Sequence, residues 1–280
     1  MDDYVIERMG EQDIEVAVSW AKAEGWNPGL NDGHCFYQTD PKGFFVGKLK
    51  GEIIAVGSAV AYDENYGFCG FYIVDEAHRH QGYGLELTLE RLAYMGERNV
   101  GIDGVLDMCD KYARLGYQMA HKNSRYRGQM RLAKIPCEAI VDAREIDFEH
   151  LLTYDARHFF TQREAFLKPW IEQDNALALA YVGDGRIKGF GVIRECFEGY
   201  KIGPLFADNE QVADTLFNHL VHHIDGAVFL LDIPEVNTSA QALVSEYGLS
   251  LVFETGRMYL RGEPDLPLDD IYGITSLELG

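Results

Sequence analysis

The sequence predicts an α/β (α+β) protein built from two similar halves, each with a mixed, mostly antiparallel central sheet flanked by helices. The chain has 280 residues, 47% of them apolar, which is enough for two hydrophobic cores. Extended apolar segments alternate with segments of helical periodicity. The order of these segments in the first 130 residues recurs in the remainder, which indicates a duplication.

The first half begins with a short strand at 4–6 and a helix at 11–24, followed by a long loop region. Strands over 44–49 and 52–62 are joined by Lys50-Gly51, a tight hairpin turn, and a further strand covers 66–74. This connectivity predicts an antiparallel meander.

A glycine-rich loop leads from the strand at 66–74 into a helix at 85–98. A strand at 100–105, a helix at 106–115 and closing strands at 117–120 and 129–132 follow. A parallel step across the helix would open the sheet beside the loop, and such an opening is a common ligand site.

The second half repeats this order, with a boundary in 133–141, around Pro136. The predicted domains are therefore 1–133 and 138–280. The expected elements are helices at 146–158, 163–170, 211–224 and 239–247, and strands at 176–182, 187–194, 199–206, 227–233 and 249–260.

Composition excludes several classes of function. A formal net charge of −20 disfavours nucleic acid as a partner, although it suits a cationic amine as well as simple solubility. Five widely spaced cysteines without a C-x-x-C pair indicate reduced thiols and no zinc site. His219, His222 and His223 lack an acid or cysteine at ligand spacing, so no metal is expected. No apolar run reaches 18 residues and the Met1-Asp2-Asp3 start is unlike a signal peptide, so we expect a cytoplasmic protein that contacts no membrane.

The loop Arg79-His80-Gln81-Gly82-Tyr83-Gly84 has the composition of a phosphate-binding loop. Main-chain N–H groups and the positive end of the helix dipole converge on an anion at such a position. Gly82 and Gly84 lack Cβ atoms, which permits a tight turn and a close approach. An ordinary glycine turn is the alternative.

Together with Lys111-Tyr112-Ala113-Arg114-Leu115-Gly116-Tyr117, this loop and the order of elements resemble the GNAT N-acetyltransferases. The loop matches the acetyl-CoA pyrophosphate motif of that family. The second segment is similar to its Tyr-x-x-x-Gly-Phe signature, with Tyr117 in place of Phe. The whole chain is similar to two-domain bacterial GNAT proteins of the YitH/HolE type, on the segments 26–29, 202–205 and 272–275.

The resemblance implies acetyl-CoA as co-substrate and no metal. It also implies a set of cofactor-binding residues along the strand edge and the loop: Ile73, Val74, Arg79, His80, Gln81, Gly82, Tyr83 and Gly84. Tyr112 occupies the position of a general acid that protonates the leaving thiolate. Packing of its ring in the sheet groove is the alternative.

The general base is left open by the sequence. Glu64, beside Asp63 and Tyr66, lies at the start of the cofactor strand, where some family members place a carboxylate. Asp32 and His34, in the loop expected to cover the acceptor, are rivals, and solvated turn acids are the plain alternative. Asn27, Asp32, His34 and Tyr66 are the predicted substrate-binding residues.

In the second half, Pro204–Glu210 replaces the glycine loop and Val244 replaces Tyr112. We therefore expect a GNAT-like fold that has lost the cofactor and the acid. The resemblance implies an N-acetyltransferase acting on a primary amine of a small molecule. The alternatives are a non-catalytic acyl-CoA sensor and an acetyltransferase of protein lysines or N-termini. The sequence does not predict the amine, the acyl preference, or whether the chain is a monomer or a homodimer.

Overall fold

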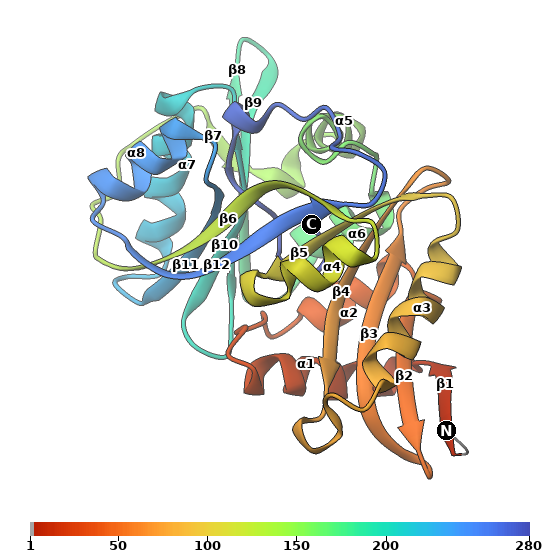
Figure 1. Ribbon diagram of the computed structural model, residues 1–280. Helices are drawn as coiled ribbons and strands as arrows, with labels where there is room; N and C mark the ends of the chain where they lie inside the picture. Colours follow the sequence, from red (N-terminus) through yellow and green to blue (C-terminus); the bar gives the residue numbers. More distant parts are fainter. Residues whose placement is uncertain (1–2) are drawn as a thin grey trace.

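The computed structural model describes residues 3–280. Met1 and Asp2, whose sequence is unlike the start of a signal peptide, lie outside the described residues. Within this range thirteen strands form one continuous sheet with helices packed around it (Figure 1). The strand order is β1-β2-β3-β4-β5-β12-β6-β11-β10-β9-β8-β7, and β13 pairs with β10. The predicted α/β class with a mixed, mostly antiparallel sheet is confirmed.

The elements of the first half are β1 Tyr4–Arg8, α1 Ile14–Ala23, α2 Asp32–Thr39, β2 Phe44–Leu49, β3 Glu52–Ala61, β4 Tyr66–Val74, α3 Tyr83–Met95, β5 Asn99–Val105, α4 Cys109–Arg114 and β6 Gln118–Gln129. Those of the second half are β7 Ile140–Asp142, α5 Phe148–Phe159, α6 Glu164–Glu172, β8 Ala176–Gly183, β9 Arg186–Glu195, β10 Tyr200–Ala207, α7 Glu210–His223, β11 Val228–Pro234, α8 Thr238–Glu246, β12 Ser250–Tyr259 and β13 Ile271–Gly273. Up to β12 the second series matches the first, element for element.

The two halves exchange a strand. β12 of the second half lies between β5 and β6 of the first, and β6 in turn pairs with β11 of the second half. All of these pairings are antiparallel. In each half, the strand that lies beside the fifth strand is the closing strand of the other half: β12 lies beside β5, and β6 lies beside β11. The sheet therefore continues without a break from one half to the other.

Two buried ion pairs hold the exchanged strands. Arg125 on β6 lies opposite Asp232 on β11 and donates two hydrogen bonds to its carboxylate, at 2.6 and 2.8 Å. Arg257 on β12 lies opposite Asp103 on β5, with two bonds of 3.0 and 2.7 Å. Directly opposite charges of this kind stabilise a strand pair and fix its register. Both pairs join a residue of one half to a residue of the other.

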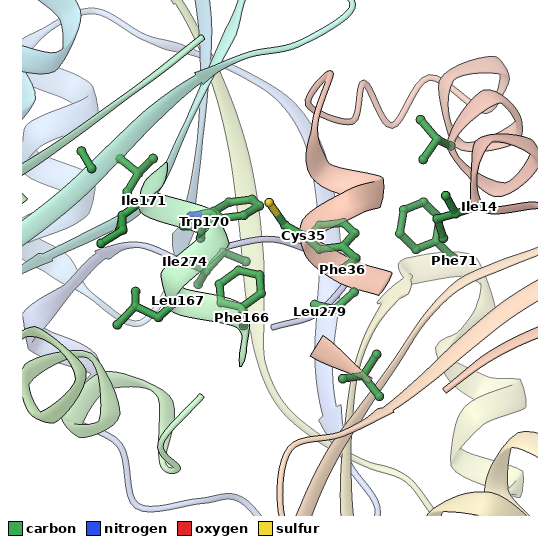
Figure 2. Close-up of a cluster of buried hydrophobic side chains, with 14 of the residues drawn as sticks. Ile14, Cys35, Phe36, Phe71, Phe166, Leu167, Trp170, Ile171, Ile274 and Leu279 are labelled. Carbon is green, nitrogen blue, oxygen red and sulfur yellow. The ribbon is translucent and has the colours of Figure 1, made fainter. Parts of the chain in front are cut away.

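The halves also share a hydrophobic core on one side of the sheet (Figure 2). Phe36 of α2 stacks on Phe166 and Trp170 of α6, with ring centroids 6.4 and 5.8 Å apart. The C-terminal segment contributes Ile274 and Leu279 to the same cluster. Burial of these rings favours a single, interlocked body.

The two halves differ where their parallel strands separate. β10 and β11 are paired over Tyr200–Ile202 only, and β13 then pairs with β10 through Leu205 and Gly273. Ile274 continues alongside β11 and donates its N–H to Asp232 O at 2.9 Å. The chain's own C-terminal segment therefore fills the opening in the second half.

Two segments differ from the prediction. The loop region contains helix α2, whose Cys35 and Phe36 are buried against the second half, a contact that local sequence does not reveal. The predicted closing strand at 117–120 is the beginning of a twelve-residue strand, β6, which ends at Gln129, and the strand predicted at 129–132 is absent because residues 130–132 have no regular structure. The polar sequence over 121–129 gives no hydrophobic strand pattern, because the buried Arg125 is satisfied by Asp232, a partner far along the chain. Residues 130–137 carry no helix or strand, and 133–141 remains the proposed boundary.

We predict that Asp232→Ala lowers the free energy of unfolding by about 3–5 kcal/mol, because it leaves the Arg125 guanidinium buried without its counter-charge. The double variant Arg125→Met/Asp232→Leu, which removes both charges, should lose less. Urea unfolding measures both.

Asp184→Ala is the control, because Asp184 forms an exposed pair with Lys188 and should change stability by less than about 1 kcal/mol. A loss in Asp232→Ala no larger than that of the control would contradict the structural role of the buried pair.

Candidate functional site

A cavity of about 600 Å³ lies where β4 and β5 separate. The two strands run parallel and pair only over Tyr66–Phe68 and Asn99–Gly101. Beyond that point they diverge, and the cavity occupies the space between 69–74 of β4 and 102–105 of β5. The carboxyl ends of separating parallel strands are a preferred place for ligands.

The glycine loop forms one end of the cavity. Gly82 precedes α3 with φ of +94° and supplies no capping side chain, so the amides at the start of the helix are left available to a ligand. His80 also adopts a left-handed conformation, with φ of +63°. Residues with positive φ allow successive main-chain N–H groups to point toward one concave site, and such a site suits an anion.

Gly84 serves a different purpose from Gly82. A Cβ atom at Gly84 would lie 2.2 Å from the Tyr72 hydroxyl and 3.0 Å from Val74 Cγ2. Gly84 therefore allows the first turn of α3 to pack closely on β4. The guanidinium of Arg79 donates to Val74 O at 2.9 Å and pairs with Glu24, which fixes the loop to the end of the strand.

The edge of β4 that faces the cavity is irregular. The register between β3 and β4 shifts after Val56, and Phe71 has a φ of +45°. Arg91 of α3, which is buried, donates to Ser58 O at 2.7 Å and to Gly70 O at 3.2 Å, so it holds the bulge in place. The sequence does not predict this role of Arg91, because only the folded meander brings those two carbonyl groups to α3.

Tyr112 of α4 lines the cavity opposite β4. Its ring packs edge-on against Tyr117, with centroids 6.2 Å apart. Burial raises the pKa of Tyr112 to about 12, and the charge of Arg91 opposes this rise. The hydroxyl is therefore protonated at neutral pH and can donate a proton or a hydrogen bond.

The other end of the cavity is built from segments far from the glycine loop. Trp26 and Arg125 come from the first half, whereas Phe253, Thr255 and Glu278 come from β12 and the C-terminal segment. The Arg125 guanidinium also donates to Trp26 O at 2.9 Å, which holds the Trp26 loop over the site. Apart from the Trp26 loop, this end has no local signal in the sequence, because only the strand exchange brings its residues together.

Several predicted residues lie elsewhere, which corrects the acceptor site expected from the sequence. Asp32 is buried in a two-bond pair with Arg194, at 2.7 and 3.1 Å, and has a structural role. His34 and Glu64 are exposed and do not line the cavity, and Tyr66 is enclosed by a separate aromatic cluster.

Of the remaining predicted residues, Ile73, Val74, Arg79, His80, Gly82 and Gly84 line the cavity. Gln81 and Tyr83 do not: the Gln81 amide donates to Ala77 O at 2.9 Å, and the Tyr83 ring packs on Tyr4 with centroids 4.7 Å apart. Asn27 lines a second cavity of about 390 Å³, which shares its wall with the first at Glu24, Trp26, Arg125 and Phe253.

The corresponding region of the second half is built differently. Helix α7 is capped by Asn209, whose side chain accepts the Val212 N–H at 3.1 Å. Where β10 and β11 separate, Leu205 and Phe206 of β10 pair with Gly273 and Ile271 of β13 instead. A small cavity of about 30 Å³ lies nearby, lined in part by Phe206, Pro234, Ile271 and Ile274.

Within 3–280, no three His, Cys, Asp or Glu side chains gather in a way that would hold a metal ion. None of the helices in this range is both long and apolar enough to cross a membrane.

Comparison with known proteins supports this architecture. Residues 12–117 match the acetyltransferase (GNAT) family and residues 151–273 match an acetyltransferase (GNAT) domain. The holothin acyltransferase of Pseudoalteromonas sp. is 30% identical over 96% of this chain and 92% of its own length. The uncharacterized N-acetyltransferase YitH of Bacillus subtilis is 23% identical over 75% of this chain and 76% of its own.

A crystal structure from Pyrococcus horikoshii, assigned as an acetyltransferase, has the same fold, with a TM-score of 0.86, 23% identity, and coverage of 100% of this chain and 97% of that one. The predicted tandem arrangement is confirmed by the two matched regions, and with it the prediction of an acyltransferase. The chain belongs to the GNAT acetyltransferases and is a tandem member of the YitH/HolE type.

Proposed function

We propose that the chain transfers an acetyl group from acetyl-CoA to a primary amine of a small molecule, at the cavity of the first half. The observation that carries the proposal is the continuity of this cavity, which runs from the glycine loop past Tyr112 to the end lined by Phe253 and Glu278. GNAT acetyltransferases use acetyl-CoA as co-substrate, and the cavity has one end suited to each reactant.

The pyrophosphate of acetyl-CoA would bind the amides at the start of α3, with the acyl arm along 73–74 of β4. The bulge that Arg91 holds would present main-chain N–H groups to the thioester carbonyl as negative charge develops on its oxygen. The Asn209 cap and the pairing of β13 with β10, where β10 and β11 separate, favour one cofactor per chain rather than two.

In the proposed reaction the amine nitrogen attacks the thioester carbonyl carbon, and the carbon–sulfur bond then breaks. Tyr112 gives its proton to the departing thiolate and regains one from the nitrogen of the tetrahedral intermediate, so that amide and free thiol are formed. Holding amine and thioester side by side supplies much of the rate enhancement.

Enclosure of the acceptor end favours a small molecule over a protein substrate. The Trp26 loop, β12 and the C-terminal segment all line it, and the second cavity beyond Trp26 offers a route for the acceptor. The relative from Pseudoalteromonas is named for acyl transfer to holothin, which agrees with this class of reaction.

The direct test is a panel of amines and amino acids incubated with acetyl-CoA, with thiol release as the readout. Turnover of at least one small amine is expected. Silence across the panel in a protein that still binds acetyl-CoA would contradict the proposal and favour an acyl-CoA sensor.

We predict that Gly84→Ala weakens acetyl-CoA binding about tenfold or more, equivalent to about 1.4 kcal/mol. The added methyl would collide with the Tyr72 hydroxyl and displace the first turn of α3 from β4. Calorimetry measures the affinity. Gly10→Ala, where the nearest atom would be 3.4 Å from the new Cβ, is the control and should bind as the wild type does. Unchanged binding by Gly84→Ala would remove the loop from the cofactor site.

Tyr112→Phe should lower kcat about 10²–10⁴-fold and leave acetyl-CoA affinity unchanged, because only the proton donor is lost. Because the pKa of Tyr112 is raised to about 12, its hydroxyl should stay protonated up to pH 10. We therefore expect no decrease in kcat up to pH 10 from deprotonation of Tyr112. Tyr181→Phe, in β8 and outside the cavity, is the control. A kcat of Tyr112→Phe equal to that of Tyr181→Phe would exclude the acid role.

A further inference from the structure

The C-terminal segment is fixed tightly against the cofactor strand. The Ser276 hydroxyl accepts the N–H groups of Glu278 and Leu279, at 3.2 and 2.9 Å, and Leu279 O accepts the Tyr62 hydroxyl at 2.8 Å. A Cβ atom at Gly70 would lie only 1.9 Å from Glu278 O, so the two backbones touch. Glu278 is therefore placed by the fold.

The Glu278 carboxylate differs from the other buried acids. Asp32, Asp155 and Asp232 each form a two-bond pair with an arginine. Glu278 is 3% exposed, and among the described residues its Oε2 atom is buried without a hydrogen-bond partner. Burying a carboxylate oxygen without a hydrogen-bond partner is costly, so a ligand group that donates a hydrogen bond there would bind favourably.

The surroundings of Glu278 point to an amine. Two further polar groups of the wall are Arg125 and Thr255. Arg125 is already committed to Asp232, whereas the Thr255 hydroxyl, also buried, has no partner. Arg194 is likewise paired with Asp32. Burial lowers the pKa of Arg125 and of Arg194, whereas their aspartate partners raise it. The charge of Glu278 adds to the net rise in both, so both guanidinium groups lie close enough to interact with it. An N–H donor would satisfy Glu278, and a second polar atom would satisfy Thr255.

We propose that Glu278 binds the amino group of the acceptor and accepts its proton, with the Thr255 hydroxyl as a second contact. This deepens the proposed function and rests on it. An ammonium group that binds Glu278 gives up one proton to the carboxylate, and the neutral nitrogen then attacks the thioester. The proton leaves Glu278 for water once the amide has formed, which balances the proton that the reaction releases overall.

Glu278→Gln tests the proposal, because the amide keeps the shape of the side chain but loses its charge and basicity. We expect kcat/KM for the amine to fall about 100-fold, with acetyl-CoA affinity within about twofold of wild type. The melting temperature should stay the same or rise, because a buried charge is removed whose Oε2 atom has no hydrogen-bond partner. Glu172→Gln, an exposed acid at the end of α6, is the matched control and should behave as wild type.

A fall in kcat/KM of less than tenfold would overturn the proposal. A lower melting temperature together with weakened acetyl-CoA binding would overturn it as well, because both would indicate a structural role.

If the wild type turns over none of the amines, the proposed function fails, and a binding measurement then tests the role of Glu278. Calorimetry with phenethylamine on the CoA-saturated protein should then show at least fivefold weaker binding by Glu278→Gln, and equal behaviour of the two proteins overturns the proposal.

Discussion

Arg125 and Arg257 lie on the two exchanged strands, and each forms a buried pair with an aspartate on the neighbouring strand of the other half. A guanidinium in a sheet interior is tolerated only with its counter-charge in place, so each pair selects one register and one neighbour. A half on its own would leave an arginine and a strand edge unpaired. Exchange therefore turns a duplicated sequence into a single folding body.

The two halves differ at the place where their parallel strands separate. In the first, β4 and β5 separate, an uncapped helix follows the loop, and the opening stays a cavity. In the second, Asn209 caps the helix and β13 fills the opening. An opening of this kind that binds no ligand would expose apolar side chains to water, and pairing of β13 with β10 buries them. The C-terminal segment that covers one opening then continues to the other.

The sequence was sufficient for what depends on local pattern. The meander, the duplication and the glycine loop follow from periodicity and turn residues, and six of the eight proposed cofactor residues do line the cavity. It was insufficient where long-range contacts decide. Strand β6 is polar because its charges are satisfied across the exchange, and Asp32 looked like a loop acid because Arg194, its partner, lies 162 residues away. Arg91 and Glu278 carry no local signal at all.

The position of the cavity follows from the exchange. The end formed by the glycine loop belongs to the first half alone, whereas Phe253, Thr255 and Glu278 at the other end come from the second. If the proposed acceptor binds at that end, sequence changes in the second half would alter its site without disturbing the loop that would bind the cofactor. A degenerate half that only stabilised its neighbour would be under no constraint to leave a carboxylate oxygen buried without a hydrogen-bond partner, since an apolar side chain there would be more stable. The unsatisfied carboxylate oxygen of Glu278 is thus the strongest structural reason to regard the second half as part of the acceptor site.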